Sequence, residues 1–236
     1  MPNSKQHLFL GGNPLIDILR KDNSFCYFAT LLFHKLFFFM RKIESMAVFC
    51  GASITNDQYI LQSASALGNL LAQRSITLIY GGAKIGIMGT VADAVLELGG
   101  NAIGVLPYFL QTKEVAHEQL SDLIICESMH ERKTKMYELS DAFIALPGGF
   151  GTMDELFEIL TWAQLGLHQQ PIGLLNINGF FSPLCTMIDT MLDKGLINTN
   201  THSLLLVDEE IESLFEKMQN YIAPDLPRWL DSNDDL

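Results

Sequence analysis

From Met46 onward, the chain alternates short apolar runs with longer amphipathic ones. The short runs hold four or five residues each and predict strands buried on both faces, at 47–50, 77–80, 102–106, 123–126, 142–146, 171–175 and 204–207. The longer runs predict helices, at 57–73, from the turn after residue 80 to about residue 98, and at 129–140, 152–165, 181–194 and 209–221. Strands that alternate with helices pair in parallel. The pattern therefore predicts an α/β fold, with a doubly wound, Rossmann-like parallel sheet and helices on both faces.

The alternating pattern divides the chain into three parts. Residues 46–223 are expected to form one Rossmann-like domain, for which we expect no membrane contact. Residues 1–45 precede it as an N-terminal extension of uncertain structure, and residues 224–236 follow it as an acidic tail.

The N-terminal extension contains a strongly apolar stretch, Phe25–Met40. Its uninterrupted runs are too short to span a bilayer as a helix. A signal peptide fits poorly, because basic residues do not lead into the stretch and no cleavage site of small residues follows. Translation that begins at Met40 or Met46 would make the leader an upstream extension. An N-terminal helix or a membrane-proximal segment is the alternative.

Composition argues against several kinds of partner. The 236 residues include 27 acidic side chains against 15 Lys and Arg, a net charge of -12, and no basic tract, so we expect no nucleic-acid partner. An acidic protein that binds an anion has to use local groups rather than its overall field. The four cysteines are dispersed and lack metal-ligand spacing, which predicts no metal site and favours a cytoplasmic protein: Cys26, Cys50, Cys126 and Cys185.

A glycine-rich run, 147–155, follows the predicted strand 142–146. Three of its residues lack a Cβ, which lets the backbone turn sharply and approach a ligand closely: Gly148, Gly149 and Gly151. Thr152 is expected to cap the next helix, whose first N–H groups then form a site for a phosphate. Asp154 and Glu155 would place carboxylates in the first helical turn, beside that site.

Two more turns follow predicted strands, one at Gly51-Ala52-Ser53 and one at Gly81-Gly82. The second turn, which continues to Gly89, fits neither a dinucleotide-binding register nor a P-loop. It is therefore either a phosphate contact through Lys84 or a tight turn with a solvated lysine. Because the carboxyl ends of parallel strands meet at one edge, the three turns predict a joint pocket there.

Charged residues near this edge supply candidate chemistry. Arg132 and Lys133 lie near the start of a predicted helix and are either local cations for an anion or a solvated helix face. Glu155 and Glu158 are three apart and share one helix face. Glu155 would face the glycine turn, and Glu158 would orient Glu155, hold a ribose hydroxyl or pair with a cation.

The run from Pro147 to Glu155 resembles the PGGxGTxxE signature of the LOG ("Lonely Guy") family, the cytokinin riboside 5'-monophosphate phosphoribohydrolases, often labelled lysine decarboxylases. The resemblance extends from about Met46 to about Tyr221 and includes several motifs in the family's order, namely Phe49-Cys50-Gly51-Ala52-Ser53, Tyr80-Gly81-Gly82, Gly86-Ile87-Met88-Gly89, Met129-His130-Glu131-Arg132-Lys133 and Trp162-Ala163-Gln164-Leu165-Gly166. The chain departs from the family at Ala52, where serine is common.

The resemblance implies hydrolysis of the N-glycosidic bond of a purine nucleoside 5'-monophosphate, with adenine or an N6-substituted adenine as base. It implies that Arg132 and Glu155 are the catalytic pair, that no cofactor or metal takes part, and that the protein is a homodimer. The implied substrate-binding residues are Ser53, Gly82, Met129, Lys133, Gly148, Gly149, Gly151, Thr152 and Glu158, while Met88 and Leu106 are candidates for the base pocket.

Two alternatives carry different chemistry. A nucleotide-binding carrier or sensor would share the fold without hydrolysis, but the retained Arg132 and Glu155 argue against it. A pyridoxal-phosphate decarboxylase needs a lysine that forms a Schiff base, and no lysine of this sequence lies in a convincing pocket setting.

Overall fold

The computed structural model describes residues 41–111 and 116–226. Apart from residues 41–45, the predicted N-terminal extension lies outside the described residues, as does the tail from residue 227 onward. No helix of the described residues is both long and apolar enough to cross a membrane.

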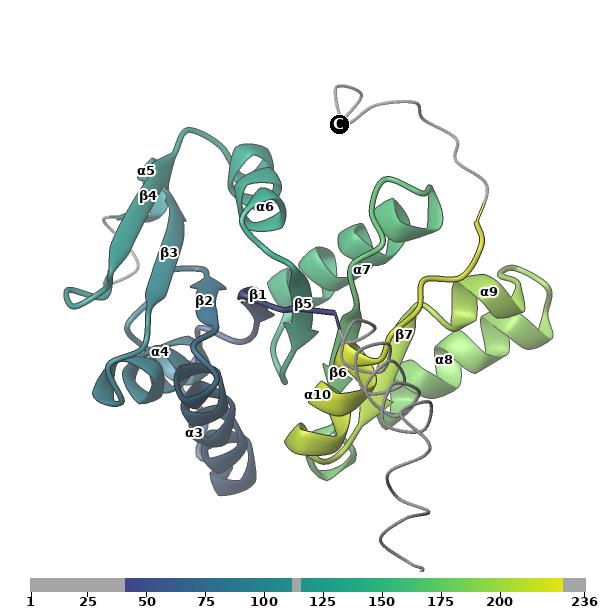
Figure 1. The fold of residues 1–236 in the computed structure, drawn as a ribbon, viewed down its shortest axis with the longest axis horizontal. Coiled ribbons are helices and arrows are strands. Elements are labelled where there is room, and N and C mark those ends of the chain that lie inside the picture. Colours follow the sequence, from purple (N-terminus) through teal and green to yellow (C-terminus); the bar gives the residue numbers. More distant parts are fainter. Residues whose placement is uncertain (1–40, 112–115, 227–236) are drawn as a thin grey trace, which may run out of the picture. The chain divides into compact units, whose positions relative to one another are not determined.

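The described residues form a seven-stranded sheet in which every pair of neighbours is parallel, in the order β4-β3-β2-β1-β5-β6-β7 (Figure 1). The strands are β1 (Ser45–Phe49), β2 (Thr77–Tyr80), β3 (Ala102–Pro107), β4 (Asp122–Cys126), β5 (Ala142–Ala145), β6 (Ile172–Leu175) and β7 (Leu205–Asp208). The chain starts in the middle, winds outward to β4, and then returns to the other side of β1. This confirms the predicted doubly wound fold and places its switch point between β1 and β5.

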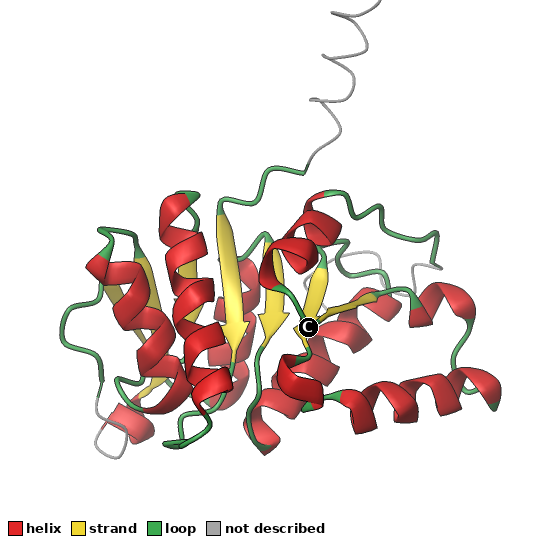
Figure 2. Cartoon of the chain, turned by 90° about the horizontal axis from the view of Figure 1, so that it is seen from below, coloured by secondary structure: helices red, strands yellow, loops and turns green. Residues whose placement is uncertain are grey.

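The helices cover both faces of the sheet (Figure 2). They are α3 (Gln58–Gln73), α4 (Gly86–Glu97), α5 (Tyr108–Gln111), α6 (Met129–Glu138), α7 (Phe150–Gln164), α8 (Ser182–Asp193), α9 (Thr199–His202) and α10 (Ile211–Gln219), with a 3-10 turn η1 (Ile177–Gly179). The strands and the long helices begin and end within two residues of their predicted bounds, except that α4 begins at Gly86, inside the turn that was predicted to continue to Gly89. The short elements α5, η1 and α9 were not predicted, because three or four residues are too few to show helical periodicity.

Alternate residues of each strand point to opposite faces and build two cores. In β1, Met46 and Val48 pack with α3, α4 and α10, whereas Ala47 and Phe49 pack with α6 and α7. Figure 1 shows these two groups of helices on opposite sides of the sheet. Since both faces of every central strand are buried, the strands are apolar throughout.

Helices α3 and α4 approach closely because Gly68 lies at their crossing. A Cβ there would come within 2.7 Å of the Ala94 Cβ. Asp57 caps α3 by accepting from the Tyr59 and Ile60 amides. Together these features hold α3 and α4 over β1 and β2, whose carboxyl ends border the site.

Candidate active site

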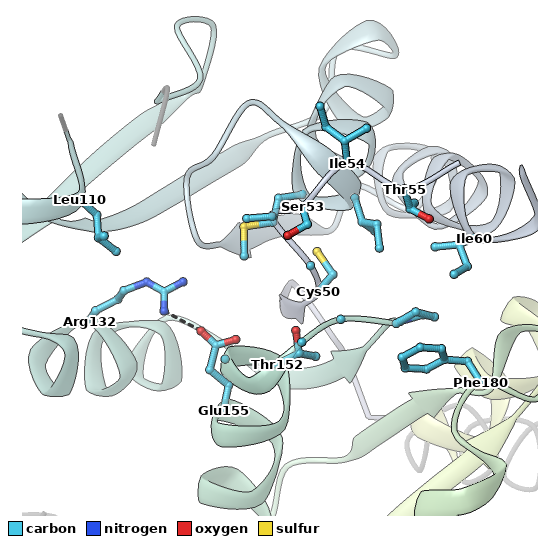
Figure 3. A pocket seen from close by; sticks show the side chains of 18 of the residues that line it. Cys50, Ser53, Ile54, Thr55, Ile60, Leu110, Arg132, Thr152, Glu155 and Phe180 are labelled. Carbon is cyan, nitrogen blue, oxygen red and sulfur yellow. Dashed lines mark hydrogen bonds and ion pairs between the residues drawn. The ribbon is translucent and has the colours of Figure 1, made fainter. Parts of the chain in front are cut away.

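A cavity of about 500 Å³ opens at the switch point, where β1 and β5 end. Residues from seven parts of the chain line it: 50–55 after β1, Ile60 of α3, Ile87 and Met88 of α4, Leu110 of α5, Met129 and Arg132 of α6, the β5–α7 turn with Thr152 and Glu155, and Phe180 after η1. Figure 3 shows Arg132 and Glu155 at one end of this cavity and Phe180 at the other. The turns after β1 and β5 therefore share one pocket, but Gly81 and Gly82 of the turn after β2, which was predicted to join them, do not line it.

Arg132 and Glu155 form a buried ion pair in the cavity wall. The Arg132 Nη1 donates to Glu155 Oε1 at 2.6 Å, and Arg132 Nε donates to the Val105 carbonyl at 3.0 Å. The side chains of Arg132 and Glu155 are 7% and 6% exposed. The Val105 carbonyl fixes the guanidinium on one side, so Arg132 presents Glu155 with a defined partner rather than a mobile charge.

Local sequence places Arg132 at the start of α6. Ser128 caps the helix by accepting from the Glu131 amide at 3.1 Å, and Glu131 Oε2 accepts from the Glu127 amide at 2.7 Å. The Arg132 amide then donates to the Ser128 carbonyl. This reciprocal capping fixes the first turn and directs Arg132 inward, while its neighbours stay closer to solvent.

Burial raises the pKa of the Glu155 carboxyl, and the Arg132 guanidinium opposes this rise. Because the arginine takes Oε1, Oε2 is the oxygen left for a substrate or a water. Burial likewise raises the pKa of the Cys50 thiol in the cavity wall. A thiol that stays protonated is a poor nucleophile, and Glu155 is the one carboxylate among the described residues that line this cavity.

Helix α7 begins two residues earlier than predicted, at Phe150, and Gly149 rather than Thr152 is its N-cap residue. Thr152 lies in the first turn, is buried, and has its Oγ1 against Gly148. No side chain caps α7. Its first amides therefore lie at the cavity without an intrahelical partner, which is the arrangement that binds a phosphate.

The early start of α7 also moves both acids into its second turn. Asp154 and Glu155 were predicted in the first turn, but that turn holds no acidic residue. Asp154 is exposed, whereas Glu155 is buried in the cavity wall. The first turn is thereby left without a carboxylate that would repel an anion.

The turns after β1 and β2 meet each other. The Ile87 and Met88 amides, at the start of α4, donate to the Gly51 carbonyl at 3.0 and 3.2 Å. Gly82 has a φ of +80° and lies behind the cavity wall, not in it. Lys84 is exposed, as expected of a solvated loop residue.

Lys133 and Glu158 lie beside the cavity and contact each other. Lys133 Nζ lies 2.9 Å from Glu158 Oε1 and 3.2 Å from Asp154 Oδ2. Burial lowers the pKa of Lys133, but the two carboxylates outweigh this and raise it overall. The two residues join α6 to α7, and their predicted contact with substrate stays a prediction.

The predicted site residues that line the cavity are Ser53, Met129, Arg132, Gly148, Gly149, Gly151, Thr152 and Glu155. Gly82, Lys133 and Glu158 do not line it, nor does Leu106, which is buried in the sheet, whereas Met88 does. In the described part of the chain, no three His, Cys, Asp or Glu side chains gather as a metal site would require.

Sequence reasoning missed Phe180, which lines the cavity and is 46% exposed. The turn after β6 presents it: Asn178 adopts a φ of +49°, and the Asn176 side chain accepts from the Phe181 amide at 2.7 Å. The turn follows a strand at the same sheet edge as the others, and this position was the available signal. Ile54, Thr55, Ile60 and Leu110 were also missed.

The fold and the site define a doubly wound α/β protein with a buried Arg–Glu pair beside an uncapped helix N-terminus at the switch point. The family described as "Possible lysine decarboxylase" matches residues 88–218. Cytokinin riboside 5'-monophosphate phosphoribohydrolase LOG4 of Arabidopsis thaliana is 42% identical over 180 residues, 76% of this chain and 84% of the relative. A probable enzyme of the same name, LOGL3 of Oryza sativa subsp. japonica, is 40% identical over 77% of this chain and 86% of its own length.

The chain belongs to this family, the LOG proteins, which confirms the resemblance seen in its motifs. Solved structures support the fold independently. The molybdenum cofactor binding protein of Rippkaea orientalis matches with a TM-score of 0.55 at 23% identity, covering 75% of this chain and 95% of that one. The molybdenum cofactor carrier protein of Chlamydomonas reinhardtii matches with a TM-score of 0.56 at 20% identity, covering 75% and 98%.

Proposed function

We propose that this protein hydrolyses the N-glycosidic bond of adenine-type nucleoside 5'-monophosphates, releasing the free base and ribose 5-phosphate. The observation that carries the proposal is the buried Arg132–Glu155 pair in the same cavity as the uncapped start of α7. The Arg132–Glu155 pair suits the sugar of a nucleotide, and the start of α7 suits its phosphate. The relatives named as cytokinin riboside 5'-monophosphate phosphoribohydrolases support the same reaction.

The 5'-phosphate binds at the start of α7, to the amides of Gly149, Gly151 and Thr152, with Gly148 giving close access. This contact is remote from the scissile bond, so its binding energy positions the sugar for attack. Met88 and Met129 offer apolar surface to the base. Ser53 at the mouth, together with Gly82, Lys133 and Glu158 behind and beside the wall, completes the proposed binding set.

Glu155 performs the chemistry. As the bond from the anomeric carbon to the base breaks, its electron pair leaves with the base and positive charge develops on the sugar. The Glu155 carboxylate stabilises this charge and takes a proton from the attacking water, whose oxygen bonds to the anomeric carbon. The proton then passes to the departing base. Arg132 favours the ionised form of Glu155 before the proton is taken and keeps the carboxyl group oriented.

The test is product analysis with adenosine 5'-monophosphate, its N6-isopentenyl derivative and the matching nucleosides. We expect free base and ribose 5-phosphate from the monophosphates and no turnover of the nucleosides. Glu155→Gln should abolish turnover while nucleotide binding persists, and Glu138→Gln, at the exposed end of α6, is the matched control. A wild-type protein that binds the monophosphate tightly and leaves it intact is a carrier or sensor instead.

We also propose that the chain acts as a homodimer. Large apolar side chains are exposed beside cavity residues: Phe150 is 97% exposed, Tyr108 70% and Phe109 50%. Surfaces of this kind are usually covered by a partner. Light scattering after size exclusion should give twice the chain mass, and Phe150→Asp should reduce it to the mass of one chain.

A cytoplasmic location is proposed on the state of the cysteines. Cys50, Cys126 and Cys185 carry free thiols. Free thiols suit a reducing compartment. Cell fractionation of the full chain, followed by detection in the cytosolic fraction, checks this location.

A further inference from the structure

The three nitrogens of the Arg132 guanidinium face three different surroundings. Nε donates to the Val105 carbonyl and Nη1 donates to Glu155. Nη2 lies over Gly81, where a Cβ built on the glycine would come within 2.5 Å of it. Gly81 does not line the cavity; it lies behind the arginine.

The backbone of Gly81 does not itself require glycine. Gly82 and Gly86 have positive φ angles, whereas Gly81 is not among the glycines that do. Alanine therefore fits the backbone at position 81, and only the space above its Cα is special. That space is filled by the Arg132 Nη2 and by the end of the Met88 side chain, whose Sδ and Cε would lie 3.0 Å from a Cβ.

We propose that Gly81 is a positioning residue for hydrolysis: its missing side chain leaves the space that the Arg132 Nη2 occupies after β2, while Nη1 donates to Glu155. This rests on the proposed function. The guanidinium is rigid and planar, so pressure on Nη2 also moves Nη1. A methyl group at position 81 therefore tilts the donor that orients Glu155.

The effects of Gly81→Ala on stability and on kcat distinguish a positioning role from a packing role. Both groups that a Cβ would meet are ends of side chains and not backbone, so the fold can accommodate alanine by small shifts. The reaction cannot, because Glu155 then loses its alignment. We therefore expect Gly81→Ala to fold normally and to lower kcat by about 100-fold, with KM for the monophosphate changed less than about threefold.

The matched control is Gly173→Ala in β6. A Cβ at Gly173 would come within 2.8 Å of the Met218 sulfur, again the end of a flexible methionine, and its φ is likewise not positive. Gly173 faces α10 and does not line the cavity. We expect both variants to shift the urea midpoint to a similar extent, and only Gly81→Ala to lose kcat.

A double-mutant comparison assigns the loss to the arginine. Met88→Ala removes the methionine contact but leaves the arginine contact. Gly81→Ala should therefore lower kcat by the same factor in the Met88→Ala background as in the wild-type protein. If Met88→Ala restores kcat instead, Gly81 acts through packing against Met88 and the proposal is overturned. Retention of wild-type kcat by a folded Gly81→Ala variant also overturns it.

Two further readouts detect displacement of Arg132 directly. The acid limb of the pH–kcat profile should move to higher pH in Gly81→Ala and stay in place in Gly173→Ala. The side-chain Nε–H signal of Arg132, assigned by its loss in Arg132→Lys, should shift in ¹⁵N spectra. If wild-type protein shows no hydrolysis, the proposed function fails, and an unmoved Nε–H signal in Gly81→Ala would separately overturn the positioning role.

Discussion

Lys133 Nζ lies 2.9 Å from Glu158 Oε1, one residue along α6 and three residues along α7 from the buried Arg132–Glu155 pair. Lys133 also pairs with Asp154, so three ion pairs join the same two helices: Arg132–Glu155 inside the cavity wall, and beside it the outer pair Lys133–Glu158 and the more exposed contact with Asp154. The outer pair is partly exposed, at 16% for Lys133 and 21% for Glu158. Its position allows it to hold the separation of α6 and α7, and thereby the geometry of the inner pair.

This relationship predicts energetic coupling. Lys133→Ala, Glu158→Ala and the double variant should show a coupling free energy of about 0.5–1 kcal/mol in urea unfolding, because the pair is partly shielded from water. Either single variant should also raise KM for the monophosphate, as expected of the proposed binding set. Strictly additive unfolding free energies would contradict the clamp between α6 and α7.

The pH dependence of hydrolysis should report Glu155. Burial raises its carboxyl pKa above the ordinary value of 4.5. Because the carboxylate is the active form, a raised pKa means that activity is lost at a higher pH than an ordinary glutamate would give. The acid limb of the pH–kcat profile should lie above pH 4.5. Arg132→Met removes the cation that opposes the rise, so the limb should move further upward; a wild-type limb at or below 4.5 would contradict this.

Neighbouring glycines in the β5–α7 turn should respond differently to the same change. A Cβ on Gly149 meets nothing within 4 Å, whereas a Cβ on Gly148 would overlap Thr152 Oγ1 and come within 2.9 Å of the Gly51 amide nitrogen. Gly149→Ala should leave the free energy of unfolding within about 0.5 kcal/mol of wild type. It should weaken nucleotide binding in calorimetry, since the open space there is the proposed phosphate site.

Gly148→Ala is the companion variant and should be destabilised, because one of its conflicts is with backbone that cannot move cheaply. We expect a loss of about 1–3 kcal/mol in urea unfolding. Equal stability of the two variants would show that the turn rearranges freely and would remove the distinction between ligand space and packing.

Asp208, which lies far from the cavity, should make the free energy of unfolding depend on pH. Hydrogen bonds from Lys217, Ser213 and the Glu210 amide hold the pKa of the Asp208 carboxyl well below its ordinary value of 3.8. A lowered pKa stabilises the fold above pH 3.8, and this stabilisation is lost as the pH falls below that value. Asp208→Asn should cost about 1–2 kcal/mol at pH 7 and progressively less at lower pH. Asp193→Asn, on the exposed end of α8, is the matched control variant.

The fold could be predicted because its signals are local. Apolar strands of four or five residues between amphipathic runs leave few arrangements other than a covered parallel sheet, and the glycine turns mark its active edge. Arg132 and Glu155 were two of several charged candidates near that edge, and the family resemblance singled them out as the catalytic pair. Their direct contact could not be predicted, since it depends on the spacing of α6 and α7.

Other features depend on backbone atoms that a sequence does not show. The Val105 carbonyl that anchors Arg132 could belong to any residue type. The start of α7 at Phe150 was missed because threonine is a better cap than glycine by propensity, yet burial of Thr152 against Gly148 decides the outcome. Phe180 was missed because its turn depends on a left-handed backbone conformation at Asn178, which composition does not predict.

The Gly51 carbonyl accepts from the Ile87 and Met88 amides, so these donors at the start of α4 are already used within the fold. The side chains of Ser128 and Asp57 likewise accept from amides in the first turns of α6 and α3. Of the N-termini of α3, α4, α6 and α7, which lie near the sheet edge, only that of α7 has first-turn amides without such an acceptor. The fold thus satisfies the starts of three helices with its own atoms and leaves the amides at the start of α7 for a ligand.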